Sequence, residues 1–157
     1  RRVAQGGTHK KTGQHHALRL NPPEAMYTTA PAVKDAFPMP RIDDAIDAMT
    51  GARYFTTIDL ASGYWQVGMD KSARRKSAFV TPFGFYEWTC MPFGLCNAPA
   101  TFQRLMNTVL GDLVPSICLV YLDDIIVFSR TFEEHLERLR LVLNRLRDAH
   151  LKVKPSK

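Results

Sequence analysis

The sequence has few cysteines and no long apolar run, and these two absences exclude two classes of protein. Its three cysteines, Cys90, Cys96 and Cys118, are an odd number without C-x-x-C spacing, which is not the pattern of a secreted disulfide scaffold. No apolar stretch approaches the length that spans a bilayer, and the first residues contain no apolar segment typical of a secretion signal. We therefore expect an intracellular protein, in the cytoplasm or nucleus, whose thiols are reduced and mostly buried.

Length and charge set further bounds. The 157 residues, 45% of them hydrophobic and 23% charged, suffice for one domain with a real core but not for two ordinary ones. The net charge of +6 is uneven, because residues 1–25 carry five basic side chains against one acidic, whereas residues 26–157 carry 16 against 14. The charge therefore permits a nucleic-acid partner without indicating one strongly.

Residues 1–32 differ from the rest of the chain. Glycine and proline are scattered there among His, Lys and Thr without helical or strand periodicity, which predicts an irregular, basic arm. From residue 33 onward the apolar spacing predicts regular elements, so the folded domain is expected at residues 33–157. In chain order we expect a helix near 42–49, a strand at 54–60, a hairpin of 76–82 and 85–91, a helix after residue 97, a hairpin of 117–122 and 125–128, a helix after residue 131, and a short strand near residue 153. This order predicts an α+β fold with an antiparallel sheet and helices packed on one face.

The two longest predicted helices each have an apolar face. In the helix after residue 97, the apolar spacing leaves Gln103 and Arg104 on the opposite, polar side. In the last helix, Thr131 and Glu134 form a capping box. The residues expected on the buried face of that last helix are Phe132, Leu136, Leu139, Leu143 and Leu146.

Three aspartates stand beside strongly apolar segments. Asp123 and Asp124 interrupt an almost wholly apolar stretch at residues 116–129, and Asp59 ends another apolar strand. Ionised carboxylates next to a core are costly unless they are paired or bind a cation. Two Mg²⁺ or Mn²⁺ ions would remove that cost, and they could activate the attacking oxygen and stabilise the leaving oxygen of a phosphoryl transfer. The alternative is a solvated hairpin tip, because Asp is common in turns.

Four long segments occur in one order along residues 33–157. They are VKDAFPMPRIDD at 33–44, FTTIDLASGY at 55–64, KSAFVTPFGFYEWTCMPFGLCNAPATFQRLMN at 76–107, and YLDD at 121–124 within SICLVYLDDIIVFS. Together they closely resemble the reverse transcriptase of gypsy-class long-terminal-repeat retrotransposons. The resemblance implies a polymerase palm-type sheet with partial fingers. It also implies RNA-directed DNA polymerase activity, in which a primer 3′-hydroxyl attacks the α-phosphate of a dNTP at two Mg²⁺ or Mn²⁺ ions.

The resemblance implies four catalytic residues and one further metal ligand. Asp59, Asp123 and Asp124 match the family's metal-binding catalytic triad, and Leu60 would add a backbone carbonyl to the same metal site. Lys157 resembles the lysine that protonates the departing pyrophosphate.

Further residues are implied to bind nucleotide or nucleic acid. Tyr64 matches the aromatic gate that crowds a ribose 2′-hydroxyl, and Phe93 and Gly94 match the segment that lines the incoming nucleotide. The residues expected to contact template or primer are Gln103, Arg104, Tyr121 and Leu122. For the aromatic residues the alternative is ordinary core packing, and for the helical Gln and Arg it is a solvated helix face.

The chain also departs from the family pattern. The run resembling RFCVDYRRLN, which family members carry just before VKDAFP, is absent, and Arg19-Leu20-Asn21 echoes its end at the wrong spacing. Our hypothesis is that residues 1–30 derive from a degenerate or frame-shifted copy. The implied partners are a primed RNA or DNA template, dNTPs, and the thumb, connection and ribonuclease H regions of a polyprotein, with no membrane partner. Two other functions stay open: a catalytically silent retroelement remnant, and a nucleic-acid-binding module that uses the basic arm.

Overall fold

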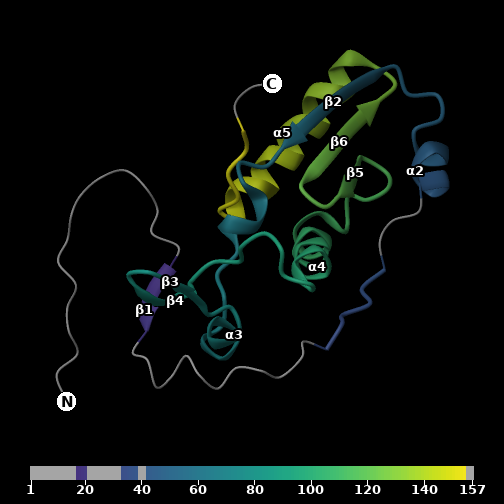
Figure 1. The fold of residues 1–157 in the computed structure, drawn as a ribbon. Coiled ribbons are helices and arrows are strands. Elements are labelled where there is room, and N and C mark those ends of the chain that lie inside the picture. Colours follow the sequence, from purple (N-terminus) through teal and green to yellow (C-terminus); the bar gives the residue numbers. More distant parts are fainter. Residues whose placement is uncertain (1–16, 21–32, 39–41, 155–157) are drawn as a thin grey trace.

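Two small antiparallel sheets organise the protein (Figure 1). The structure is a computed structural model that describes residues 17–20, 33–38 and 42–154. One sheet has the strand order β2-β6-β5 and the other β1-β4-β3. The elements are β1 (Ala17–Leu20), α2 (Ile42–Ala48), β2 (Tyr54–Asp59), the 3-10 helix η1 (Gly63–Gln66), α3 (Lys71–Lys76), β3 (Phe79–Thr81), β4 (Gly84–Trp88), α4 (Ala98–Leu110), β5 (Cys118–Tyr121), β6 (Asp124–Ser129) and α5 (Phe132–Asp148).

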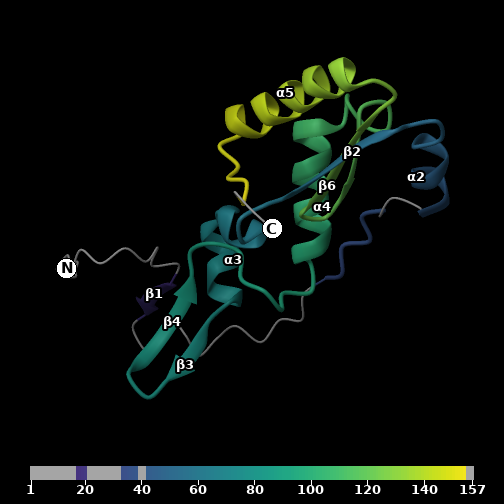
Figure 2. The ribbon, with the colours of Figure 1, turned by 90° about the horizontal axis from the view of Figure 1, so that it is seen from above.

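The β2-β6-β5 sheet holds the core against helices α4 and α5, which lie on the same side of it (Figure 2). Side chains alternate across a strand, so one face of this sheet is buried under the helices while the other is open. The buried strand residues include Ile58, Cys118, Val120, Ile125 and Val127. This arrangement confirms the predicted α+β fold with helices on one face of an antiparallel sheet.

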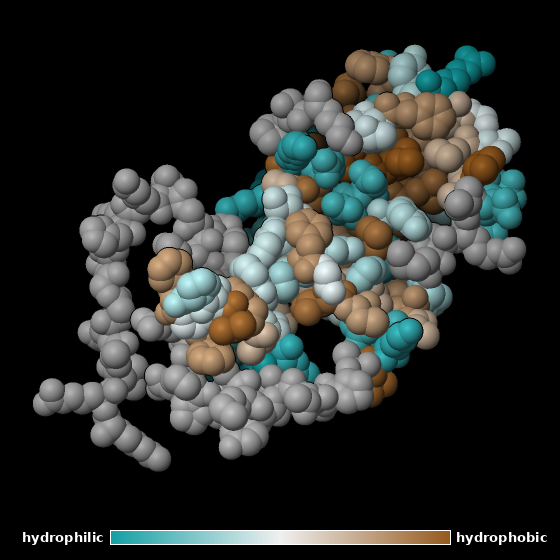
Figure 3. Space-filling model, viewed as in Figure 1, coloured by the Kyte–Doolittle hydropathy of each residue, from teal (hydrophilic) through white to brown (hydrophobic). Residues whose placement is uncertain are grey.

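The open face of this sheet is apolar at one end and acidic at the other. Phe55 is 52% exposed there, and in the register of the strands it lies opposite Phe128. Figure 3 shows brown, apolar residues over the upper part of this side of the molecule, with teal, hydrophilic residues beside them toward the middle. The acidic end carries Asp59 and Asp124, the residues that end β2 and begin β6.

The second sheet contains the predicted hairpin and one strand that sequence reasoning missed. β3 and β4 turn at Pro82–Phe83, one residue before the turn predicted at Phe83-Gly84. Ala17–Leu20, which we expected to be irregular, forms β1 and pairs with β4. Four residues are too few to show a period, and their pairing is with a segment far along the chain, so no local signal marks them. The rest of the predicted arm lies outside the described residues.

The buried face of helix α5 agrees with the prediction only in part, at Leu146, which is buried, and at Leu139, which packs against the core. Its N-terminus has the expected cap, in which the Thr131 side chain accepts a hydrogen bond from the Glu134 backbone N–H. However, the buried residues are His135, Val142 and Leu146, and the expected core residues with more than two-fifths of their surface exposed are Phe132, Leu136 and Leu143. The imidazole of His135 contacts the Thr56 hydroxyl at 2.8 Å, which joins the helix to β2.

Among the described residues, no helix is long and apolar enough to cross a membrane. The three cysteines are free thiols there, but only Cys118 is buried, so the expectation of mostly buried thiols is wrong for the exposed Cys96. Burial raises the pKa of the Cys118 thiol to about 11, which keeps it protonated and unreactive at neutral pH.

A sharp turn after α5 sends the chain back toward the end of β2. His150 has a φ of 58°, the left-handed conformation in which glycine is normally found at the end of a helix. Its N–H bonds to the Arg147 carbonyl, and the Leu151 N–H bonds to the Leu146 carbonyl. The next residues run antiparallel to the continuation of β2, where Val153 forms an isolated bridge with Leu60 in place of the short strand predicted near residue 153.

We predict that His150→Gly stabilises the protein. The left-handed conformation costs a residue with a Cβ about 1 kcal/mol, and glycine avoids that cost. Chemical unfolding should therefore show an increase in the free energy of unfolding, whereas His150→Ala, which keeps the Cβ, should leave it near the wild-type value. Equal stability of the glycine and alanine variants would contradict this account of the turn.

Candidate active site

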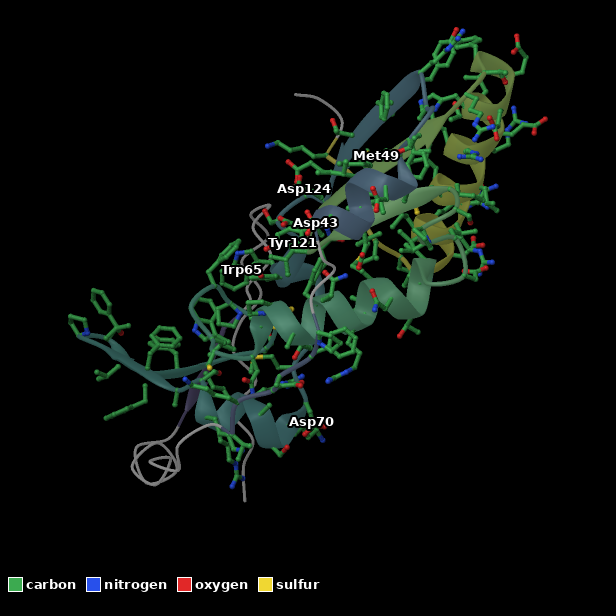
Figure 4. All side chains as sticks on the ribbon, turned by 90° about the vertical axis from the view of Figure 1, so that its right-hand side faces the viewer. Asp43, Met49, Trp65, Asp70, Tyr121 and Asp124 are labelled. Atoms are coloured by element: carbon green, nitrogen blue, oxygen red, sulfur yellow. The ribbon has the colours of Figure 1, made fainter. Side chains whose placement is uncertain are left out.

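The register between β2 and β6 brings the three aspartates to one end of the sheet. Asp59 is directly opposite Asp124, and opposed residues in an antiparallel pair have Cα atoms about 4.5–5.5 Å apart. Asp123 lies in the two-residue loop between β5 and β6, and its carbonyl accepts a hydrogen bond of 3.3 Å from the Leu60 N–H. Figure 4 shows Asp124 at this end of the sheet, close to Tyr121, its register partner on β5.

The surroundings of the three carboxylates differ. Asp124 is exposed and Asp123 is half-buried, while the Asp59 side chain is 26% exposed and its Oδ2 lies 3.7 Å from the Lys154 ammonium. Carboxylate oxygens are the ligands that Mg²⁺ and Mn²⁺ prefer, so the donor chemistry fits these ions. Within the described ranges, however, no group of three or more His, Cys, Asp or Glu side chains is arranged to hold a metal ion. The backbone thus juxtaposes the aspartates, and their side chains are not gathered into one ligand set.

Close packing fixes the position of Asp123. Gly63 is buried, and a Cβ at this position would lie 3.0 Å from the Phe102 ring and 3.1 Å from the Asp123 Cβ. Phe102 is fully buried on α4, so a side chain at Gly63 would have to displace its ring or the Asp123 Cβ by a few tenths of an ångström. Glycine therefore suits the tight packing where η1, α4 and the loop of Asp123 meet.

Aromatic residues line the region next to the aspartates. Tyr64 is half-buried, with its ring centroid 5.2 Å from that of Phe93 and 5.3 Å from that of Phe102. Burial raises the pKa of the Tyr64 phenol, and the negative charge of Asp123 raises it further, so the phenol stays protonated. Phe93 is 63% exposed, and Gly94 next to it has a φ of 89° with open space around it. Tyr64 and Phe93 are therefore accessible from solvent, unlike ordinary core aromatics.

Gln103 does not lie on a solvated face of α4, so its expected contact with template is wrong. Its side chain is fully buried, and its Oε1 accepts a 2.8 Å hydrogen bond from the Leu122 N–H. Its Nε2 donates to the Val120 carbonyl at 3.3 Å and to the Asn107 Oδ1 at 3.1 Å. The amide supports the β5–β6 loop from within the core, and Leu122 has a φ of 54° at that point. Because its polar groups find partners inside the protein, the side chain tolerates burial.

Arg104, next to it on α4, is exposed as predicted but already has partners. Its guanidinium forms an ion pair with Asp35 at 2.8 Å and lies over the Phe37 ring. The Asn97 side chain bonds to the backbone of Val33 and Asp35, which ties residues 33–38 to the start of α4. Asn97, the residue type expected to cap a helix that begins after residue 97, forms no side-chain cap on α4.

The other predicted site residues divide into three groups. Tyr121 is 53% exposed at the open face, where a nucleic acid could reach it. Leu60 is buried with its backbone beside Asp123. Lys157 lies outside the described residues. Sequence reasoning missed Lys154 and Gln66, whose contacts involve backbone groups or a side chain distant in sequence, so no motif could have revealed them.

Comparisons with known proteins agree with these features. A family profile described as "Reverse transcriptase (RNA-dependent DNA polymerase)" matches residues 10–157. The chain is 50% identical over 125 residues to the retrovirus-related Pol polyprotein from transposon 297 of Drosophila melanogaster, covering 80% of this chain and 12% of that protein. It is 44% identical over 117 residues to an RNA-directed DNA polymerase homolog of Oenothera berteroana, covering 73% of this chain and 82% of that protein. The chain thus spans only a small part of the Drosophila polyprotein.

Solved structures show the same fold. The foamy viral protease-reverse transcriptase in complex with an RNA/DNA hybrid is 28% identical with a TM-score of 0.69, over 78% of this chain and 16% of that one. The same viral protein in complex with dsDNA is 30% identical with a TM-score of 0.63, over 80% of this chain and 25% of that one.

We predict that Gln103→Leu destabilises the protein by about 2 kcal/mol or more. Leucine has a similar volume to glutamine but no amide, so the Leu122 N–H and the Val120 carbonyl would lose their buried hydrogen-bond partner. Urea unfolding measures this loss. As a matched control, Arg104→Gln on the same helix removes an exposed ion pair and an exposed contact with the Phe37 ring, and it should cost about 1 kcal/mol or less. Equal losses for the two variants would mean that the buried amide does not support the loop.

Proposed function

This chain belongs to the reverse transcriptase family, and we propose on that premise that it contributes the nucleotidyl-transfer site of an RNA-directed DNA polymerase. The observation that supports the proposal most directly is the pairing of Asp59 with Asp124, with Asp123 in the adjoining loop. Three hard oxygen ligands at one exposed sheet end suit a reaction of phosphate esters.

The three aspartates are the proposed ligands of two Mg²⁺ or Mn²⁺ ions, with the Leu60 carbonyl as a further ligand. Two bound ions would supply charge stabilisation for both the attacking 3′-hydroxyl and the departing pyrophosphate. The protein's own part is to orient the carboxylates: β2 and β6 hold Asp59 and Asp124 opposite each other, and Gly63 allows Asp123 to approach η1. Most of the rate would then come from positioning and electrostatics.

Tyr64, Phe93 and Gly94 are the proposed boundary of the nucleotide site. Burial and, second to it, the negative charge of Asp123 raise the pKa of the Tyr64 phenol, so its ring lies near this proposed metal ligand. A ring in this position would crowd the 2′-hydroxyl of a ribonucleotide and favour dNTPs. Gly94, with open space around its Cα, would permit close approach of the nucleotide to the backbone.

A primed RNA or DNA template is the proposed macromolecular partner. Tyr121 and the backbone of Leu122 are at the open end of the sheet, where the primer end would have to lie to reach the aspartates. Arg104 could contact template only by exchanging its ion pair with Asp35. The solved viral relative was captured with an RNA/DNA hybrid, which supports this partner class. The remaining partners we propose are the thumb, connection and ribonuclease H regions of a polyprotein.

A second candidate is a chain that has the site residues but is catalytically silent on its own. The observation that favours it is the lack, among the described residues, of an assembled group of three metal-binding side chains. Ligands that need template, primer and further domains to converge would not act alone. The third possibility, nucleic-acid binding through the basic arm without chemistry, depends on residues 1–32, most of which lie outside the described ranges.

We predict that Asp59→Asn and Asp123→Asn each abolish DNA synthesis while the fold is kept. The chain would be tested alone with Mn²⁺, and as a replacement for the 125-residue matching segment of the transposon 297 polyprotein. Loss of one metal ligand should lower primer extension on an RNA template at least about a thousandfold, or ~4 kcal/mol in the barrier.

The control is Asp112→Asn, since this exposed aspartate pairs with Arg145. It should retain extension in the chimera. Extension by the chimera but not by the isolated chain would support the silent candidate, and near-normal extension by either Asp59→Asn or Asp123→Asn would refute the catalytic assignment.

We also predict that Tyr64→Ala relaxes the choice of sugar. Removing the ring frees the space for a 2′-hydroxyl, so the ratio of ribonucleotide to deoxyribonucleotide incorporation should rise at least about tenfold. Single-nucleotide incorporation by the active chimera measures it. Tyr54→Ala, at the far end of β2, should leave the ratio unchanged, and an unchanged ratio for Tyr64→Ala would remove Tyr64 from the nucleotide site.

A further inference from the structure

The segment after α5 is fastened beside Asp59 by hydrogen bonds from both backbone and side chain. The Lys154 N–H donates to the Asp59 carbonyl at 2.8 Å, and the Ala61 N–H donates to the Lys152 carbonyl at 2.9 Å. Val153 and Leu60 lie opposite each other between these two bonds. Residues 152–154 therefore extend the sheet next to β2, at the end that carries the carboxylates.

The Gln66 amide adds a clamp to this junction. Its Oε1 accepts from the Lys152 N–H at 2.7 Å, and its Nε2 donates to the Lys152 carbonyl at 3.0 Å. The same Nε2 donates to the Ala61 carbonyl at 2.8 Å. One side chain thus joins both strands, and it satisfies both backbone groups of Lys152 as a neighbouring strand would.

The clamp has an electrostatic consequence for Asp59. Lys154 follows Lys152 by two residues, and its ammonium lies 3.7 Å from the Asp59 Oδ2. Among the ion pairs of the described residues, this is the one that involves a member of the aspartate triad. The cation offsets the mutual repulsion of the carboxylates, and it also repels any other cation that approaches Asp59.

We propose that Gln66 is a positioning residue that holds Lys154 against Asp59, so that Lys154 acts as a built-in competitor of the divalent ion at that carboxylate. The inference rests on the proposed function, because it assumes that Asp59 is a metal ligand. Lys154 keeps the carboxylate neutralised until a divalent ion displaces the ammonium. The pair thereby raises the ion concentration at which the site fills.

The size of the effect follows from the exposure of the pair. The Lys154 side chain is 52% exposed, so solvent screens its charge. A unit charge and a doubly charged ion about 6 Å apart in a water-like dielectric repel by ~1.4 kcal/mol, which is about tenfold in affinity before salt screening. Removal of the lysine charge should therefore tighten binding about threefold to tenfold.

The test measures Mn²⁺ binding to the 157-residue chain from the decrease in the electron paramagnetic resonance signal of free hexaaqua Mn²⁺. Lys154→Gln should lower the Mn²⁺ Kd about threefold to tenfold. Gln66→Met, which keeps the length but removes the amide, should lower it in the same direction by a smaller factor. The double variant should match Lys154→Gln alone, because Gln66 acts through Lys154.

Three controls separate this mechanism from simpler ones. Arg140→Gln removes one positive charge from the exposed side of α5 and should leave the Kd unchanged. Lys154→Arg keeps the charge and should bind Mn²⁺ like the wild type. Thermal unfolding of each variant shows whether it is folded. If Gln66→Met is unfolded, the comparison of Lys154→Gln with Arg140→Gln still tests whether Lys154 competes with the divalent ion.

The outcomes distinguish a failure of this inference from a failure of the proposed function. If Asp59→Asn binds Mn²⁺ as the wild type does, Asp59 is no ligand, and both the proposed site and the inference fail. If Asp59→Asn loses binding but Lys154→Gln leaves the Kd unchanged or raises it, the site stands and the inference is overturned. If Gln66→Met is folded and has a wild-type Kd, or if the two effects add in the double variant, Gln66 does not act by positioning Lys154.

Discussion

The antiparallel register of β2 with β6 is the constraint on which the site depends. It sets Asp59 opposite Asp124 and brings Leu60 to the carbonyl of Asp123. A shift of one residue would move every side chain of β2 to the other face, burying Asp59 under the helices and exposing Ile58. The hydrophobic core opposes such a shift, because Ile58, Ile125 and Val127 must all face α4 and α5. Burial of apolar residues thus determines where the charged ones meet.

Support for the acidic end comes from three directions around the sheet. The Gln103 side chain on α4 accepts a hydrogen bond from the Leu122 N–H in the β5–β6 loop. Gly63 on η1 lets that loop pack closely. Gln66 joins the strand after α5 to the continuation of β2. The two glutamines differ in burial, since Gln103 is fully buried and Gln66 is partly exposed. The buried amide of Gln103, with its three hydrogen-bond partners, makes the loop rigid. The partly exposed amide of Gln66 can rearrange when a neighbouring charge changes.

Much of the fold could be predicted from local signals, and the failures have physical causes. The strands, the two hairpins and α4 follow from apolar periodicity and turn residues. The buried face of α5 was predicted only in part, at Leu139 and Leu146, because apolar residues surround much of that helix and the buried His135, which contacts Thr56, carries no apolar signal. β1 was missed because it depends on pairing with β4, and α3 because its six residues carry little apolar pattern.

The site shows a similar division. The apolar segments around them singled out the three aspartates, and the resemblance then matched them to a metal-binding triad. It did not supply Gln66 or Lys154, whose importance depends on hydrogen bonds to backbone and on a distant charge. Gln103 was placed on the wrong face because periodicity alone treats every polar residue as solvated, although a satisfied amide can be buried.

The orientation of the Gln103 amide has an evolutionary consequence. Its oxygen faces an N–H and its nitrogen faces a carbonyl, so the two ends cannot be exchanged without losing both bonds. Glutamate is one base change away from glutamine in the genetic code, yet a carboxylate here would confront the Val120 carbonyl and add a buried negative charge near Asp123. Substitution of Gln103 by glutamate is therefore disfavoured, although it needs only a single base change.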